Sequence, residues 1–447
     1  MALSAVTTTG IYCHPGCSAS THPTNVVPYE SAAAAEADGF RACLRCRPYR
    51  THHADPWVQG PELVCRATRL IVDGALDFEL EADLAKRLGV SARHLRRLFL
   101  EHVGATPDQV ARSRRAHFAR RLLDDSDLPI SDIVFAAGFG SVRQMARVMH
   151  DVFQASATEL RAKRRQSDRL VADGGLDTRL TFRPPLAWGA LLAFLAPRAI
   201  PGVESVANGT YRRTIEVDGL TGALEVWRDH DHLMARFHLP RWEGLIHHVA
   251  RVRRLFDLDH DPNDVSAALR DDAALSPWPA GLRVPGCWDP FEAGVRAIVG
   301  QQVSVAGAAT TMGKIVAAHG VAASGLDELG LGFRFPQPAA LVDADLPIPR
   351  RRATAVRAFA EAVAERRLPL DASIPLDRFA EQVCTLPGVG PWTAQYLALR
   401  LGYADAFPAS DLGVIKALGG ASLTETTERA EAWRPWRAYA TFRLWSR

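Results

Sequence analysis

Apolar residues recur with a helical period from Leu80 to Lys163, which predicts a series of short amphipathic helices. Ser91 follows the turn residue Gly89 and is a suitable N-cap for one of these helices. The apolar face of that helix carries Leu95, Leu98, Phe99 and Val103. Arginines on the same helix fall away from this face, as side chains that enter a DNA major groove would. These arginines are Arg93, Arg96 and Arg97.

The same pattern occurs a second time, 50 residues further along the chain. The matching pairs are Ser91 and Ser141, Leu95 and Met145, Arg97 and Arg147, and Val103 and Phe153. Two helix-turn-helix units in tandem explain the repeat, and two ordinary helical hairpins are the alternative.

The pattern changes after this helical region. The polar stretch of residues 161–178 contains a Gly-Gly pair and predicts a linker. Up to about Asp261, short segments that predict β-strands alternate with segments that predict helices, and the remainder of the chain predicts helices. The predicted strands are YRRTIEVDG, GALEVWRD and HLMARFHL. The sequence predicts domains at residues 1–55, 61–165, 179–284 and 285–447, with the linker at 166–178.

Length and composition agree with several folded domains. The chain has 447 residues, of which 47% are hydrophobic and 23% charged, so general disorder is excluded. The most apolar segment, Pro184 to Pro197, is too short to cross a bilayer, contains three prolines and predicts a buried helix. The N-terminus lacks the pattern of a secretion signal. We therefore expect a cytoplasmic protein with no membrane partner.

Positive charge is concentrated in one third of the chain. The net charge is only +3, but residues 41–169 hold 23 Lys and Arg against 16 Asp and Glu. This excess is a candidate surface for nucleic acid, although such runs also occur as plain solvated surface.

Four of the seven cysteines lie in the first 50 residues as C-x3-C and C-x2-C. Two close pairs separated by a loop can place four sulfurs around one tetrahedral Zn²⁺. The spacing therefore predicts a zinc site formed by Cys13, Cys17, Cys43 and Cys46. Spacing alone leaves open whether such a site is purely structural or chemically active.

The sequence segments around these cysteines resemble the N-terminal domain of Ada-type DNA-methylphosphotriester methyltransferases. These segments are TTTGIYCHPGC and NVVPYESAAAAEADGFRACLRC. The resemblance implies that Cys13 accepts a methyl group irreversibly from a DNA phosphotriester, and that the lost anionic ligand strengthens DNA binding. The family has a strand before TTG, which we do not expect here. It also has arginines where this chain has His14, Ser18 and Ser20, which predicts fewer phosphate contacts.

The tandem helical repeat resembles the AraC family of transcription regulators. The resemblance implies base contacts from the exposed side of each recognition helix, by Arg93, Arg96, Arg143 and Gln144. We expect phosphate contacts from Arg112, Arg114 and Arg115. The proline that follows the first recognition helix, Pro107, is replaced by Ala157 in the second, a change that bears on helix orientation there and not on DNA binding.

The sequence LPGVGPWTAQYLALR, from Leu386 to Arg400, predicts a tight turn between two helices. Gly388 and Gly390 allow the backbone to approach a phosphate, and the amides that begin the second helix face the anion. Such a hairpin grips duplex DNA without reading sequence, but glycine turns also serve plain helix packing.

Residues 181–445, with this hairpin, the aspartate of FPASDLGVIKAL and the segment WRPWRAYATFRLW, resemble the helix-hairpin-helix DNA glycosylases, and specifically the AlkA-type 3-methyladenine glycosylase II. The resemblance implies that Asp411 is the catalytic carboxylate. It implies base-pocket aromatics at Trp392, Tyr396 and Trp445, for which core packing is the alternative. It further implies DNA contacts from Gln302, as the wedge that fills the space of a flipped base, and from Gly388, Val389, Gly390 and Thr393.

Other positions restrict the chemistry. Bifunctional relatives have a lysine where this chain has Trp392, so we expect hydrolysis without strand cleavage. Cys287 and Cys384 stand alone in the sequence and are expected to be buried thiols, not cluster ligands. Together with Cys65 they lack the P-C-H-R context of a second Ada methyltransferase, so repair of O6-methylguanine is not predicted.

The sequence thus predicts a multidomain protein, mainly α with α+β parts: a small α/β domain with a four-cysteine zinc site, a tandem helix-turn-helix, an α+β (TBP-like) subdomain and an all-α glycosylase domain. We expect a monomer that senses alkylation, regulates transcription and excises alkylated bases. Its partners would be double-stranded DNA, alkylated and promoter, with RNA polymerase as a further candidate. Two alternatives stay open: a regulator whose glycosylase half is only a DNA-binding scaffold, and a glycosylase with an inert zinc module.

Overall fold

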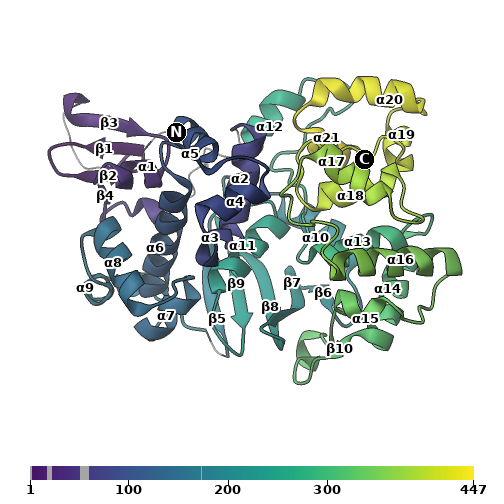
Figure 1. Ribbon diagram of the computed structural model, residues 1–447, viewed down its shortest axis with the longest axis horizontal. Helices are drawn as coiled ribbons and strands as arrows, with labels where there is room; N and C mark the ends of the chain where they lie inside the picture. Colours follow the sequence, from purple (N-terminus) through teal and green to yellow (C-terminus); the bar gives the residue numbers. More distant parts are fainter. Residues whose placement is uncertain (1–2, 18–22, 51–59, 173, 447) are drawn as a thin grey trace. The chain divides into compact units, whose positions relative to one another are not determined.

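The computed structural model describes residues 3–17, 23–50, 60–172 and 174–446. The chain forms two compact units (Figure 1). The first is Met1–Thr181 with Arg241–Ala250, and the second is Phe182–Pro240 with Arg251–Arg447. The expected class, multidomain and mainly helical with α+β parts, is confirmed. Within the described ranges, no helix has the length and apolar character required to span a bilayer.

The first unit begins with a four-stranded sheet of order β3-β1-β2-β4 and one short helix, α1 (Ala32–Ala37). The strands are β1 (Leu3–Val6), β2 (Ile11–Cys13), β3 (Val26–Tyr29) and β4 (Arg41–Ala42). Strand β1 runs antiparallel to β2 and β3, and β2 runs parallel to β4. The expectation that no strand precedes TTG is wrong, because the apolar run LSAV forms the buried strand β1. Ser18 and Ser20 lie outside the described residues.

Eight helices follow in the described part of this unit. They are α2 (Glu62–Val72), α3 (Ala75–Phe78), α4 (Glu81–Arg87), α5 (Ala92–His102), α6 (Pro107–Asp125), α7 (Ile130–Ala136), α8 (Val142–Phe153) and α9 (Ala157–Ala162). The predicted recognition helices are α5 and α8, and each begins after a serine whose hydroxyl accepts a hydrogen bond from a backbone N–H in the first turn of the helix. Leu95, Phe99 and Val103 are buried and Leu98 packs beside them, as predicted.

Ala157 begins α9 as Pro107 begins α6. Each helix start is fixed by a capping box, in which Thr106 pairs with Gln109 and Ser156 pairs with Glu159. Helix α9 therefore begins with the same kind of capping box as α6, without the proline.

The predicted linker is partly ordered against the rest of the first unit. It contains a 3₁₀ turn (Gln166–Asp168) and the start of β5 (Leu176–Leu180). Asp168 accepts a hydrogen bond from Arg47, and the Leu170 N–H donates to the Asp125 carbonyl at 2.8 Å. The polar side chains of the predicted linker therefore form charged contacts within the first unit as well as facing solvent.

The second unit contains the predicted β-rich region. Strands β6 (Glu204–Ala207), β7 (Thr210–Val217), β8 (Leu220–Asp229) and β9 (His232–His238) form successive antiparallel pairs. Helix α10 (Trp188–Leu195) lies in the predicted apolar segment, and α12 (Pro262–Leu269) follows later. Helix α11 (Leu245–Leu255) contains the point where the chain passes from unit one back to unit two.

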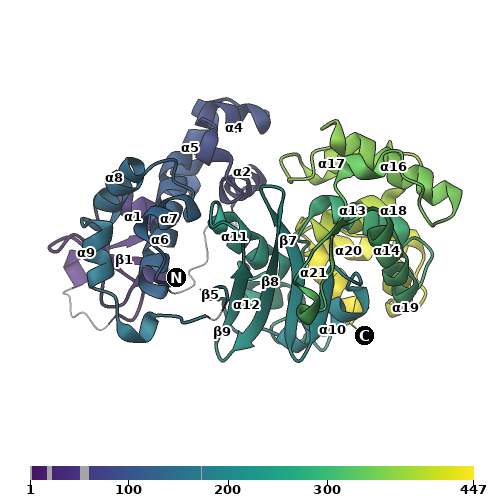
Figure 2. The ribbon, with the colours of Figure 1, turned by 90° about the horizontal axis from the view of Figure 1, so that it is seen from below.

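The C-terminal region is mainly helical (Figure 2). Its helices pack around one large hydrophobic core. Its helices are α13 (Pro290–Val299), α14 (Val305–His319), α15 (Pro338–Leu341), α16 (Arg350–Ala364), α17 (Leu376–Cys384), α18 (Pro391–Arg400), α19 (Leu412–Ala417), α20 (Leu423–Ala430) and α21 (Arg437–Trp445). It also contains a small hairpin, β10 (Val321–Ala322) with β11 (Phe333–Arg334), so the all-α expectation is slightly wrong.

The expectation that two isolated cysteines are buried is also wrong. Cys384 is exposed and Cys287 is half-buried. Cys384 is the last residue of α17, whose buried face is formed by Phe379 and Val383, so its thiol falls on the solvent side.

Candidate active site and DNA-binding elements

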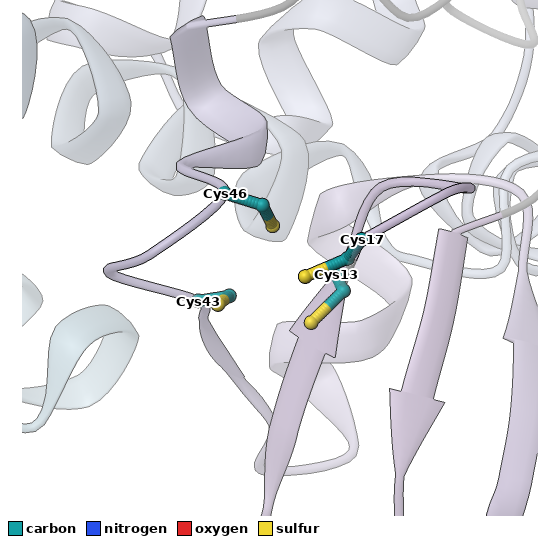
Figure 3. Close-up of side chains that lie close together, drawn as sticks. All are labelled: Cys13, Cys17, Cys43 and Cys46. Carbon is teal, nitrogen blue, oxygen red and sulfur yellow. The ribbon is translucent and has the colours of Figure 1, made fainter. Parts of the chain in front are cut away.

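Four cysteine sulfurs converge at one end of the N-terminal sheet (Figure 3). Cys13 ends β2 and Cys17 lies in the turn that follows, while Cys43 and Cys46 follow β4. All four sulfurs lie within 4.8 Å of one another. A tetrahedral zinc ion with sulfurs at about 2.3 Å sets them roughly 3.8 Å apart. The donor set therefore fits a thiolate-bound metal, as the spacing predicted.

The charges of the thiol groups also favour a cation at this place. Burial and the neighbouring Cys46 and Cys43 raise the pKa of Cys13 well above its usual value. Burial likewise raises the pKa of Cys46, to about 12. Four thiolates this close repel one another, and a divalent cation removes that penalty. Cys13 and Cys43 are buried, whereas Cys17 and Cys46 are half-buried.

Sequence reasoning missed the side chains that join the cysteine module to α6. The Tyr12 hydroxyl donates to Glu36 Oε1 at 2.7 Å, and His117 of α6 lies 2.5 Å from the same oxygen. Arg50 pairs with Asp125 at 2.7 Å. A hint was present in the sequence, since the basic residues that follow Cys46 and the acidic end of α6 have opposite charge.

The predicted base-reading residues lie on the outer faces of α5 and α8. Arg93, Arg96 and Arg143 are exposed. Arg96 is engaged by Glu81 at 2.6 Å, so it must leave that partner to reach a base. Gln144 is half-buried, and its amide oxygen accepts the Gly140 N–H at 2.8 Å.

The predicted phosphate contacts are only partly compatible with the structure. Arg112 is half-buried and approaches Asp151 at 3.5 Å. Arg114 is also half-buried. Arg115 is buried, with a 2.9 Å ion pair to Asp77, so its assignment to phosphate is wrong. The helical period places it on the inner side of α6, where the pair compensates its charge.

The predicted helix-hairpin-helix forms between α17 and α18. Gly388 has φ = 74°, and a Cβ there would lie 3.1 Å from Ala355 Cβ. A Cβ at Gly390 would meet nothing within 4 Å, so that position is free for a close external group. Val389 and Thr393 are buried, which leaves their backbone amides, not their side chains, for a phosphate.

The predicted wedge residue, Gln302, is exposed at the turn between α13 and α14, with φ = 54°. The side-chain amide of its neighbour Gln301 donates two hydrogen bonds through Nε2, to Gly388 O at 3.1 Å and to Thr393 Oγ1 at 2.9 Å. The wedge turn and the hairpin are thereby fixed to each other. The sequence did not single out Gln301.

Asp411 is the N-cap of α19, and four N–H groups hold its carboxylate. Oδ1 accepts from Trp445 Nε1 at 2.8 Å, Gly413 N at 2.9 Å and Val414 N at 3.1 Å. Oδ2 accepts from Trp392 Nε1 at 2.9 Å. Among the described residues no ion pair forms with this carboxylate.

Asp411 lines a cavity of about 570 Å³ in the second unit. The predicted aromatics, Trp392, Tyr396 and Trp445, line it as well. The rings of Trp392 and Tyr396 are stacked with centroids 5.2 Å apart, and Tyr396 lies 5.9 Å from Trp445. Two of these aromatics therefore have a role that the sequence did not indicate, which is to orient the carboxylate through their indole N–H groups.

Comparison with known proteins identifies three domain types along the chain. Residues 2–49 match the metal binding domain of Ada, residues 84–163 a helix-turn-helix domain and residues 177–289 the AlkA N-terminal domain. These matches define a class of protein that joins an Ada-type metal-binding domain and a helix-turn-helix domain to an AlkA-type domain.

The chain is 39% identical to a probable bifunctional transcriptional activator/DNA repair enzyme AlkA of Mycobacterium tuberculosis, over 99% of this chain and 92% of that protein. It is 37% identical to DNA-3-methyladenine glycosylase 2 of Escherichia coli, over 60% of this chain and 95% of that protein. A 3-methyladenine DNA-glycosylase structure from Archaeoglobus fulgidus shares the fold, with 21% identity, a TM-score of 0.52 and coverage of 61% and 97% of the two chains. The chain belongs to the family of bifunctional transcriptional activator/DNA repair enzymes AlkA.

Proposed function

We propose that this protein removes alkylated bases from double-stranded DNA by N-glycosidic hydrolysis, and that its first unit senses phosphate methylation and regulates transcription. The placement of Asp411 carries the proposal for the enzyme. A carboxylate with no cationic partner among the described residues lies on the wall of a cavity large enough for a base. The family membership and the three domain matches support the combination.

The glycosylase chemistry follows from the fixed carboxylate. As the bond between C1′ and the base nitrogen breaks, its electron pair leaves with the base and positive charge develops on the sugar. Asp411 faces that charge without reorientation, because four N–H groups already hold it. Water then adds to C1′ and loses a proton to solvent. Trp392 stands where a lyase would need an amine, so the product is an abasic site.

A mutational assay tests this proposal. Asp411→Asn should abolish release of 3-methyladenine from methylated duplex DNA while DNA binding is retained. Asp343→Asn replaces an exposed carboxylate elsewhere in the second unit and should leave release unchanged. If the wild-type protein releases no base, the second unit is a DNA-binding scaffold and the glycosylase proposal is refuted.

For the first unit we propose that the four cysteines bind Zn²⁺ and that Cys13 accepts the methyl group. Zinc, when bound by these four cysteines, would keep their sulfurs deprotonated at neutral pH. The sulfur–carbon bond forms as the ester carbon–oxygen bond breaks, and the electron pair stays on the phosphate oxygen. Methylation removes one negative charge from the module, which reduces its repulsion from DNA.

Peptide mapping after exposure to methylphosphotriester DNA tests the choice of cysteine. A gain of one methyl, about 14 Da, is expected on the peptide that contains Cys13. Cys17 and Cys46 are more accessible, and a methyl found on either of them would contradict the proposal. No transfer at all would make the zinc module inert.

The same proposal includes promoter DNA at the helix-turn-helix units. Arg93 and Arg143 carry the base contacts most directly, because their side chains are exposed. A contact with RNA polymerase and a monomeric state stay predictions from the sequence, and so do the domain boundaries.

A further inference from the structure

Three consecutive arginines, Arg350, Arg351 and Arg352, form the first turn of α16. In this arginine cluster Arg350 and Arg351 are exposed and Arg352 is half-buried. The first turn contains no acidic residue, and the N-cap residue, Pro349, provides no side-chain cap. Cations are disfavoured at this place, because the free backbone N–H groups at the start of a helix carry positive partial charge. The arginine cluster therefore does not stabilise its own helix.

The charges of the arginine cluster are also left without acidic partners. Within the ranges that the structure describes, no carboxylate forms an ion pair with any of the three guanidinium groups. The other end of α16 differs, because Arg367 pairs there with Glu361 at 3.3 Å and with Glu365 at 2.6 Å. The positive charge at the start of the helix is thus available to an external anion.

The arginine cluster lies against the turn of the helix-hairpin-helix. A Cβ at Gly388 would lie 3.1 Å from Ala355 Cβ and 3.9 Å from the carbonyl oxygen of Arg351, so the first turns of α16 pack on the hairpin turn. The Gly388 carbonyl also accepts the hydrogen bond from Gln301 at 3.1 Å. The hairpin, the wedge turn and the arginine cluster therefore meet at one residue of the second unit.

The chemistry of the arginine cluster fits the phosphates of a DNA backbone. A guanidinium group stays charged at neutral pH and donates paired hydrogen bonds to phosphate oxygens. The adjacent hairpin is predicted to present backbone amides to a phosphate, and the open space at Gly390 allows a close approach. A phosphate contact carries no sequence information, which suits a protein that must engage damage in any sequence. An acidic protein would also attract the arginines, but a DNA backbone continues from them onto the hairpin.

We propose that Arg350 and Arg351 extend the grip of the hairpin by binding further phosphates of the same duplex. They increase the affinity of the second unit for DNA and take no part in the cleavage of the glycosidic bond. This inference rests on the proposed glycosylase function, for which it names a second set of backbone contacts.

The test uses the full chain and duplex DNA that contains 7-methylguanine. The protein concentration for half-maximal single-turnover release reports productive DNA binding, and the rate at saturation reports the later steps. In the double variant Arg350→Gln/Arg351→Gln the half-maximal concentration should rise roughly 5- to 50-fold at about 0.1 M salt, with the saturated rate within about twofold of the wild type. The slope of log concentration against log salt should fall by about 1–2, because each phosphate contact contributes about 0.9.

The matched control is Arg366→Gln/Arg367→Gln, which removes the same charge from two exposed arginines at the other end of α16, roughly 20 Å away. Its half-maximal concentration and salt slope should match those of the wild type. An equal rise in both double variants would reduce the effect to net charge and overturn the inference. An unchanged half-maximal concentration in the cluster variant would also overturn it, and would leave an acidic protein as the partner of this surface.

A binding titration separates this inference from the proposed function. Fluorescence anisotropy with a duplex that carries a tetrahydrofuran abasic-site analogue measures DNA affinity without base release. If the wild type releases no base, the glycosylase proposal fails, and the affinities of the two double variants in this titration still decide the role of the arginine cluster. Weaker binding by the cluster variant alone supports that role, and equal affinities refute it.

Discussion

Replacement of each indole beside Asp411 by a phenyl ring tests how the carboxylate is held. Trp392→Phe removes the hydrogen bond to Oδ2, for which no second donor is found in the described part of the chain. Hydrogen bonds to charged groups contribute about 1.5–3 kcal/mol. At about 1.4 kcal/mol per factor of ten, the release rate should fall roughly 10- to 150-fold. The phenyl ring retains the stacking on Tyr396, so the cavity wall is preserved.

Trp445→Phe should have a smaller effect, less than about tenfold, because Oδ1 keeps its two backbone donors, Gly413 N and Val414 N. The assay is single-turnover release of 7-methylguanine, with Trp227→Phe in β8 as a control that should match the wild type. Equal rates in all three variants, or a larger loss in Trp445→Phe than in Trp392→Phe, would show that the indoles do not orient the carboxylate.

Three further predictions concern the hairpin, the core and pH. Gly388→Ala should lower the free energy of unfolding by about 1–2 kcal/mol in urea, because its φ is positive. Gly390→Ala should leave stability unchanged but weaken DNA binding in a titration, since its Cβ fills the space for a phosphate; the reverse order would contradict this account. Arg115→Ala should cost about 3 kcal/mol of stability without a specific loss of DNA affinity, because the buried carboxylate of Asp77 would lose its arginine and keep only the 2.8 Å contact with His247. Burial lowers the pKa of His260, but the carboxylate of Asp257 raises it by more, so the net pKa lies above the usual 6.5. The contribution of the protonated imidazole to the stability of the fold is therefore fully present below about pH 6.5 and is lost as pH rises through the folded-state pKa. The difference in free energy of unfolding between the wild type and His260→Gln should therefore be larger at about pH 5.5 than at about pH 8.5. Equal differences at the two pH values would refute this linkage.

Local signals predicted many of the secondary-structure elements. The recognition helix of residues 92–102 follows from its apolar period and from Ser91, because both act within a few residues of the helix. The β-rich words of residues 204–238 follow from alternation and turn residues. Strand β1 was missed because LSAV is stabilised by its neighbours β2 and β3, and not by its own four residues.

The sequence by itself determined the domain types, the four-cysteine cluster and the position of Asp411. Each of these depends on residue spacing or on short sequence motifs, which can be recognised without knowledge of the three-dimensional structure. Tertiary structure alone decided which polar groups surround them. It placed Arg115 inside and turned two indole N–H groups onto Asp411. The physical reason is that a charged side chain takes its partner from whatever the fold brings near it, and these partners lie from 19 to 38 residues away along the chain.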